Sequence, residues 1–273
     1  MKKILSLALS ALLVASLAVS ASAAALAGAN CKTAKAEVKA AAETPVQDGK
    51  IGEYEYAKIA TPLADLNISD EKAKDVGFEL YLAYDKDYLY YALKTTHEKH
   101  KNENDKDMTT IWNSDGIQIS GAKAKPASAT DRGEIGYALS STSGKVLYNT
   151  WSDALKSGFK AAAEDIKIVV DGQTAIYEGK VPAKFFGETS FEKGDSFRAS
   201  FMVNTLIGGT RYYIEWGTGV GSSKDANSHA TITLGDAIEL PKKAAPATAD
   251  ATSVAILALA ASLAAGYVVA KKH

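Results

Sequence analysis

Two of the three tryptophans in this sequence stand where a flat ring could contact a ligand. Trp112 precedes the turn-prone stretch 113–116, which reads Asn-Ser-Asp-Gly, and Trp216 precedes 217–219, which reads Gly-Thr-Gly. Each ring is therefore expected near the end of a strand. A tryptophan exposed there can stack on a sugar, whereas a buried one is an ordinary core residue of a β-sandwich. The sequence leaves both interpretations open.

Patterns that mark common catalytic sites are missing from the sequence. It has no Gly-x-Ser-x-Gly turn for a hydrolase nucleophile and no glycine-rich phosphate loop after a strand. Many carboxylates are present, but nothing singles out the facing pair that a glycosidase needs. The one cysteine, Cys31, lies in a segment that we interpret as a linker. We therefore expect no catalysis by this chain.

One polar loop contains residues that could bind a metal ion. His97 and His100 lie in a stretch rich in Lys, Glu and Asn, where a histidine pair is usually only solvated. The acidic residues Glu103, Asp105 and Asp107 follow, but the glycine and the closing glutamate of an EF-hand loop are absent. These residues do not predict a specific metal site.

The elements that must position the candidate side chains are strands. Residues 77–94 predict a hairpin, because apolar residues alternate with polar or small ones on both sides of a turn at 85–87. A second hairpin is predicted from 166–170 into 174–181, turning on Asp171-Gly172. An isolated hairpin is marginal in water, so these strands need a second layer to cover them.

The remaining segments complete an all-β pattern. A short corner is expected at 182–186, and the one helix-length candidate is 151–159. Further strands are predicted at 53–59, 109–120, 133–140, 145–151, 196–204, 211–216 and 230–234. Strands at regular spacing predict a single antiparallel β-sandwich, jelly-roll-like, over residues 44–240.

The beginning of the sequence is typical of a secretory signal peptide over residues 1–23. A basic start and an apolar stretch are followed by Ala21-Ser22-Ala23, which predicts cleavage after Ala23. A membrane anchor is the alternative. Residues 24–43, with a Lys- and Ala-rich part at 32–39, are predicted to be a linker. The domain is therefore expected outside the cell, and the net charge of −1 does not favour nucleic acid as a partner.

The end of the sequence predicts an anchor. Residues 251–273 contain an apolar run of bilayer length and finish on Lys271-Lys272-His273, which favours a transmembrane helix with a cytoplasmic end. The linker 241–250 contains Pro-Ala-Thr-Ala-Asp. This order resembles Gram-positive cell-wall sorting signals, in which sortase would join Thr248 to the wall, although Ala245 and Ala249 depart from that pattern. Sortase attachment and a plain membrane anchor both stay open.

Four segments, in order along the chain, resemble the family-9 carbohydrate-binding modules and their DOMON-like relatives. They match the family's opening, its Tyr/Trp-Asp-x-x-Tyr-Leu-Tyr hairpin, its Trp-x-x-Asp-x-Val-Glu element and its strand ending in Ile-Pro. The matching segments are Asp48-Gly49-Lys50-Ile51, Tyr84-Asp85-Lys86-Asp87-Tyr88-Leu89-Tyr90, Trp112-x-x-Asp115-x-Ile117-Gln118 and Tyr177-Glu178-Gly179-Lys180-Val181-Pro182.

The resemblance implies a sugar site in which two tryptophans clamp the terminal sugar of a glucan or xylan. Trp112 matches the first ring, and Gln118 stands where the family has Glu. The segment 221–227, where the second ring is expected, contains no aromatic residue, and Trp216 matches a position several residues earlier. Arg211 is matched loosely to a sugar-contacting arginine. The resemblance also makes structural calcium possible, without indicating its ligands.

Together these features predict a surface-anchored, non-catalytic carbohydrate-binding module. The alternative is a structural or adhesive surface protein that keeps the sandwich without a sugar site. A remote alternative is a haem-binding DOMON-like domain, in which Met108 or Met202 and a histidine would be axial ligands; the Cys-x-x-Cys-His attachment motif is absent.

Overall fold

The computed structural model describes residues 34–221 and 223–240, and residues up to Ile238 belong to one compact unit. The predicted cleavage site at Ala23, the sorting-like motif around Thr248 and the tail 251–273 lie outside the described residues. No helix within the described ranges has the length and apolar character needed to cross a bilayer.

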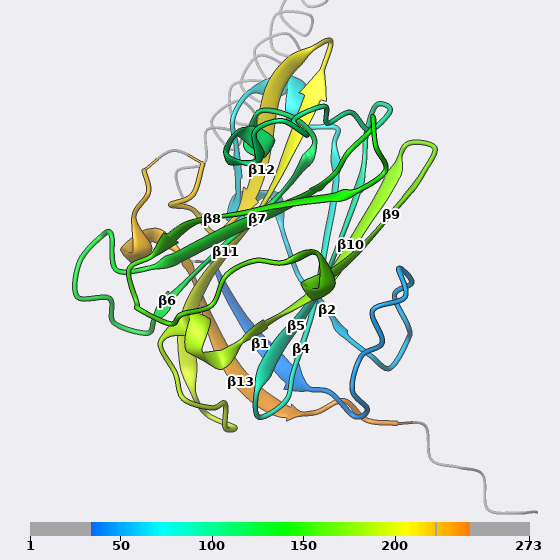
Figure 1. Cartoon of the computed structure of the whole chain (residues 1–273). Helices are drawn as coiled ribbons and strands as arrows, with labels where there is room; N and C mark the ends of the chain where they lie inside the picture. The colour runs from blue at the N-terminus through cyan, green and yellow to red at the C-terminus, as the bar shows by residue number, and fades with distance from the viewer. Residues whose placement is uncertain (1–33, 222, 241–273) are drawn as a thin grey trace, which may run out of the picture. The chain divides into compact units, whose positions relative to one another are not determined.

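Strands dominate the described chain, as predicted (Figure 1). The strands are β1 (Lys35–Ala40), β2 (Ala57–Ile59), β3 (Leu66–Ile68), β4 (Gly77–Tyr84), β5 (Tyr88–Thr96), β6 (Gly116–Lys123), β7 (Gly133–Leu139), β8 (Val146–Asp153), β9 (Ile166–Asp171), β10 (Thr174–Pro182), β11 (Ser196–Ile207), β12 (Thr210–Trp216) and β13 (Ala230–Ala237). The short 3-10 helices are η2 (Leu63–Asp65), η3 (Glu71–Ala73), η4 (Met108–Asn113), η5 (Ala163–Asp165), η6 (Ala183–Phe186) and η7 (Ala226–Ser228).

All these strands join one continuous sheet, in the order β8-β7-β6-β11-β13-β1-β4-β5-β10-β9. In addition, β12 pairs with β11 and β3, and β2 pairs with β4. The pairs are antiparallel except those of β1, which runs parallel to β13 and β4. The all-β prediction is therefore confirmed, with a sheet that is mixed rather than purely antiparallel.

Strand β1 overturns part of the linker prediction for residues 24–43. Its pairs include Lys35 with Thr231 and Val38 with Leu234. The lysines of this segment suggested a solvated tether, but alanine and valine alternate with them at the period of a strand. Val38 is completely buried, so one face of β1 belongs to the core.

The predicted hairpin at 77–94 is confirmed as β4 and β5, with Tyr84 opposite Leu89. Its inward face carries completely buried residues such as Leu80, Leu82 and Tyr91. The ring centroids of Tyr91 and Phe201 are 6.1 Å apart, which joins β5 to β11 across the interior. Each such side chain stabilises the fold by roughly 1.5–3 kcal/mol through burial.

The predicted helix at 151–159 is wrong. Strand β8 continues to Asp153, and the chain then turns with positive φ at Lys156 and Gly158. The Asp153 carboxylate accepts hydrogen bonds from the backbone N–H groups of Ser157, at 2.8 Å, and Gly158, at 3.2 Å. A side chain that bonds nearby backbone donors in this way favours a turn over a helix. The second predicted hairpin is confirmed as β9 and β10, and the predicted corner is η6.

Candidate functional site

The candidate site lies on the face of β6, β7 and β11 that points away from the core. Along β6 the side chains alternate, so Ile117 and Ile119 pack in the core while Gln118 and Ser120 point to the other face. Gln118 lies opposite Met202 of β11 and Gly136 of β7 in the sheet register. These three neighbouring strands form the floor of the site.

A cavity of about 470 Å³ lies over this floor. Its volume falls in the range of roughly 300–1,000 Å³ that is usual for small-molecule sites. The residues that line it are Trp112, Gln118, Arg132, Glu134, Trp151, Arg211, Val220, Gly221 and Lys224.

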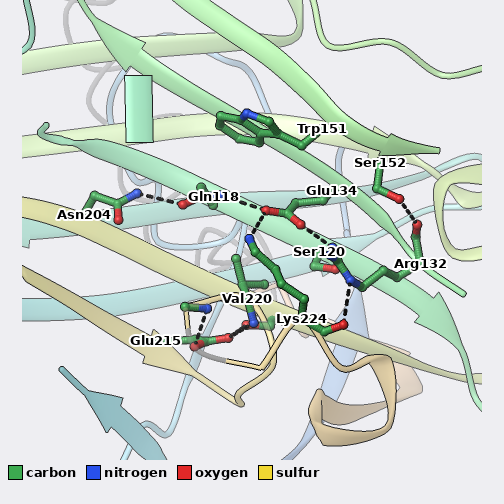
Figure 2. Close-up of polar contacts among 12 residues, drawn as sticks. Gln118, Ser120, Arg132, Glu134, Trp151, Ser152, Asn204, Glu215, Val220 and Lys224 are labelled. Carbon is green, nitrogen blue, oxygen red and sulfur yellow. Dashed lines mark hydrogen bonds and ion pairs between the residues drawn. The ribbon is translucent and has the colours of Figure 1, made fainter. Parts of the chain in front are cut away.

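A row of buried polar side chains crosses the floor (Figure 2). Asn204 Nδ2 donates to Gln118 Oε1 at 3.1 Å, and Gln118 Nε2 donates to Glu134 Oε1 at 2.9 Å. Because each amide uses its oxygen for one neighbour and its nitrogen for the next, the orientation of the whole row is fixed.

Glu134 ends this row and is held by two cations. Arg132 Nη1 donates to Glu134 Oε2, and Lys224 Nζ lies 2.5 Å from Glu134 Oε1. The two cations reach the carboxylate from the side away from Trp151 (Figure 2). A buried carboxylate is costly unless it is paired and hydrogen-bonded, and here both conditions are met.

Arg211 occupies the other end of the row. Its Nε and Nη2 both donate to Asn204 Oδ1, at 3.0 and 2.6 Å. Its guanidinium carbon lies 5.0 Å from the centroid of the Trp112 ring and 5.2 Å from that of Tyr213. Burial lowers the pKa of Arg211, but an arginine starts so high that it keeps its charge at neutral pH. The guanidinium is thus a fixed cation with one face of Trp112 against it.

Two indole rings border the cavity. Trp112, on η4, is 38% exposed. Trp151, on β8, is half-buried, and its Nε1 donates to the carbonyl of Thr109 in η4 at 3.0 Å. The Trp151 ring packs over Gly136, where an added Cβ would lie 2.5 Å from the ring, so only glycine leaves room for it.

Three of the four predicted sugar-binding residues come together in this cavity: Trp112, Gln118 and Arg211. The prediction for Trp216 is wrong, because this side chain is completely buried against Phe201, with ring centroids 6.4 Å apart. The reason is the alternation along β12. Trp216 shares the inward face with Ile214, while Arg211 and Glu215 belong to the other face.

Sequence reasoning missed several site residues. Trp151 was placed at the boundary between the predicted strand 145–151 and the helix candidate 151–159, and its position two residues after Asn149 and four after Leu147 puts it on one face of β8. Glu134, a lone charge inside the apolar strand 133–139, was a usable signal, since a charge in a buried strand needs a partner. Lys224 gave no signal, because it sits in a loop, where its φ of 51° is left-handed.

Glu215 holds the loop that carries Val220, Gly221 and Lys224 through hydrogen bonds to its backbone. Its carboxylate accepts hydrogen bonds from Val220 N at 2.7 Å, Gly221 N at 3.1 Å and Ser200 Oγ at 2.6 Å. Burial raises the pKa of Glu215, and these donors oppose that rise. The backbone at this edge of the cavity is therefore preorganised.

His229 fastens the end of the same loop. Its Nδ1 donates to the carbonyl oxygen of Thr218 at 2.8 Å, and its Nε2 lies 2.8 Å from Ser120 Oγ. Burial lowers the pKa of His229 to about 4. The imidazole is therefore neutral at pH 7, and it ties the loop to the floor strand β6.

The other candidate ligands do not form a site. His97 Nδ1 contacts Thr205 Oγ1 at 2.9 Å, whereas His100 Nε2 contacts the carbonyl of Leu139 at 2.8 Å, so the two rings have separate partners. Across the described ranges, no three His, Cys, Asp or Glu side chains converge as metal ligands do, and we assign none to calcium. Met202 is completely buried in the sheet, while Met108 is 38% exposed.

Comparison with solved structures identifies the architecture. A family-9 carbohydrate-binding module from Caldicellulosiruptor kristjanssonii in complex with glucose superimposes with a TM-score of 0.54 at 14% identity, covering 77% of this chain and 100% of the module. The chain has the family-9 fold. The same module in complex with cellotriose gives a TM-score of 0.54 at 14% identity, over 78% of this chain and 98% of the module.

Beyond the four short segments that resemble the family, the likeness to the family-9 fold is visible in the structure and not in the sequence as a whole. No protein-family profile and no curated protein matches the sequence. At 14% identity the likeness establishes how the strands are arranged. The function has to be argued from the side chains in the cavity.

Proposed function

We propose that this chain is a carbohydrate-binding module without catalysis of its own and that the cavity between Trp112 and Trp151 is its glycan site. The observation that carries the proposal is the combination of two indole rings with a row of fixed polar groups in one cavity. A sugar ring has apolar C–H faces and a rim of hydroxyl groups. Aromatic faces bind the first and oriented amides and charges bind the second.

The contacts assign a role to each part of the cavity. The guanidinium of Arg211 covers one face of Trp112, which leaves the other face for a sugar. Gln118, Glu134 and Arg211 would exchange hydrogen bonds with the hydroxyl groups. Because their mutual hydrogen bonds already hold them in place, ligand binding would cost little side-chain conformational entropy. A module of the same fold has been solved with glucose and with cellotriose, which supports a saccharide ligand.

The proposal places the domain at the cell surface, anchored through its C-terminal segment. The basis is the sequence: a signal peptide with cleavage after Ala23 and an apolar run closed by lysines at 251–273. Deleting residues 246–273 should release the protein into the medium. Thr248→Ala separates the two anchoring mechanisms, since only sortase attachment depends on that residue. If the truncated protein stays with the cells, the anchor prediction fails, unless the domain itself binds the wall.

The test of the glycan site is Trp112→Ala. We expect binding on a glycan array that includes glucans and xylans to be lost, while the melting temperature stays close to wild type because the ring lies at the surface, 38% exposed, and outside the core. Tyr54→Ala is the matched control: Tyr54 is also 38% exposed but does not line the cavity. It should change neither property.

Two results would count against the proposal. If Trp112→Ala keeps full binding to a glycan that the wild type binds, the site is elsewhere. If the wild type binds no glycan at all, the alternative of a structural or adhesive surface protein takes its place. A large drop in melting temperature for Trp112→Ala would mean that the ring is a packing residue.

A further inference from the structure

The cavity carries a surplus of positive charge that the proposed function does not require. Its ionisable lining residues are three cations, Arg132, Arg211 and Lys224, and one carboxylate, Glu134. Their net formal charge is +2, whereas the whole chain has a net charge of −1. The surplus is therefore a local property of this cavity.

We infer that the cavity selects saccharides that carry a carboxylate, that is uronate-type sugars, over their neutral counterparts. This inference rests on the proposed function and names the ligand class of the same site. A neutral sugar would leave the cation surplus uncompensated in a partly buried space. A carboxylate on the sugar would compensate it and gain charge-assisted hydrogen bonds.

The arrangement of Arg211 suits a planar carboxylate. The two bonds to Asn204 use Nε and Nη2, and neither uses Nη1. The rings of Trp112 and Tyr213 lie against the guanidinium and hold its plane. An arginine fixed in this way presents its N–H groups in one direction and loses little entropy on binding.

Lys224 supplies a second cation at the end of the polar row where Glu134 lies. Its side chain is 50% exposed, and its Nζ shares the Glu134 carboxylate with Arg132. One carboxylate therefore serves two cations. An incoming carboxylate near Lys224 would restore one anion for each cation at this end of the cavity.

Other carboxylates near the cavity are already saturated with donors. Glu215 accepts two backbone N–H groups and the Ser200 hydroxyl group beneath the loop. Asp225, next to Lys224, accepts from Asn227 N at 2.9 Å and Ser228 Oγ at 3.0 Å. Neither lines the cavity. Glu215 and Asp225 weaken the positive electrostatic potential of the region at long range. They do not pair with the cations that line the cavity.

The experiment is calorimetric titration of the full chain with matched saccharides. One pair is a cello-oligosaccharide and the same oligosaccharide oxidised to a carboxylate at C6; a sulfated analogue and sodium acetate complete the set. We expect the uronate form to bind about 10- to 100-fold more tightly than the neutral form, the gain typical of hydrogen bonds to charged groups. The preference should shrink as salt is raised from about 0.05 to 0.5 M.

Two variants locate the effect. Lys224→Met should reduce uronate affinity about tenfold and change the neutral sugar little. Lys58→Met is the matched control, because Lys58 is 57% exposed and pairs with Glu79 but does not line the cavity. Gln118→Glu, nearly isosteric, adds a carboxylate beside Glu134 and should abolish the preference; its melting curve verifies that it folds.

The outcomes separate this inference from the proposed function. Equal affinity for both forms, with binding lost in Trp112→Ala, overturns the charge inference and keeps the glycan site. Tight binding of the sulfated analogue but not the uronate overturns carboxylate selection. If acetate binds as tightly as the uronate, the sugar ring contributes nothing, and the proposed function fails as well. The proposed function also fails if no saccharide binds. The inference of carboxylate selection is supported if the preference for the uronate is sensitive to salt, is lowered by Lys224→Met and is left intact by Lys58→Met.

Discussion

The surroundings of Trp216 and Trp112 differ, although both tryptophans stand next to turns in the sequence. Trp216 is completely buried and packs on Phe201, which in turn packs on Tyr91, so its neighbours are aromatic core residues. Trp112 is 38% exposed and packs on the guanidinium of Arg211. Residue type alone therefore does not identify a binding ring. The face of the strand and the polarity of the neighbours decide between core and cavity.

The largest expected effect comes from breaking the aromatic core. Trp216→Ala should destabilise the fold by roughly 3–5 kcal/mol, because it removes a buried ring and leaves a cavity. For a domain of this size that lowers the melting temperature by on the order of 10 °C. Trp216→Phe, which keeps a ring, is the control and should recover most of the loss. A Trp216→Ala protein that melts like wild type but loses glycan binding would reverse the roles assigned to the two tryptophans.

The next effect depends on pH and tests the polar layer between core and cavity. His229 has a pKa of about 4 when folded and about 6.5 when unfolded, so the unfolded chain binds more protons between these values. Stability should therefore be fully present above pH 6.5 and fall as pH drops towards 4. The contribution of His229 to this fall is about 3 kcal/mol.

Denaturant titrations at several pH values measure this contribution as a difference. His229→Gln cannot take up the proton and should show a flatter pH dependence than wild type over that window. Other buried groups, such as Glu178, whose pKa is raised by burial, act equally in both proteins and cancel in the comparison. Parallel curves for the two proteins would show that His229 is not the titrating group.

The smallest effect sharpens the cavity side of the comparison. Trp151→Phe keeps an aromatic ring over Gly136 but removes the donor to the Thr109 carbonyl, at a cost of about 1 kcal/mol. Because Thr109 belongs to the helix that carries Trp112, glycan affinity should fall more than stability does. Chemical denaturation and calorimetric titration measure the two effects. Unchanged affinity would mean that Trp112 does not depend on this hydrogen bond.

Local patterns were enough to predict most of the fold. The hairpin β4–β5 follows from alternation that ends at a turn, and β9–β10 follows from Asp171-Gly172 between two apolar runs. Strand β1 was missed because lysines mask its alanine and valine positions. Its strand character depends on pairing with β13 at the far end of the sequence, and no local pattern contains that information.

The site was predictable only in part, for a similar reason. Trp112, Gln118 and Arg211 were found through the family resemblance. Lys224 and Asn204 belong to the site because the loop after β12 and the register of β11 bring them to Glu134 and Gln118. Such contacts between distant segments depend on the assembled sheet, and single-residue spacing does not reveal them.

The position of β1 also bears on the order in which the molecule can be assembled. This strand is made first among the described strands, yet it lies inside the sheet between β4 and β13, the last one. The sheet therefore cannot be completed until synthesis has passed residue 237. Pairing across so long a sequence separation slows folding. A fragment that begins at residue 44 would leave β13 with an unpaired edge, which invites association with another chain. The time during which this edge is open is the period in which the newly made protein is most exposed to aggregation.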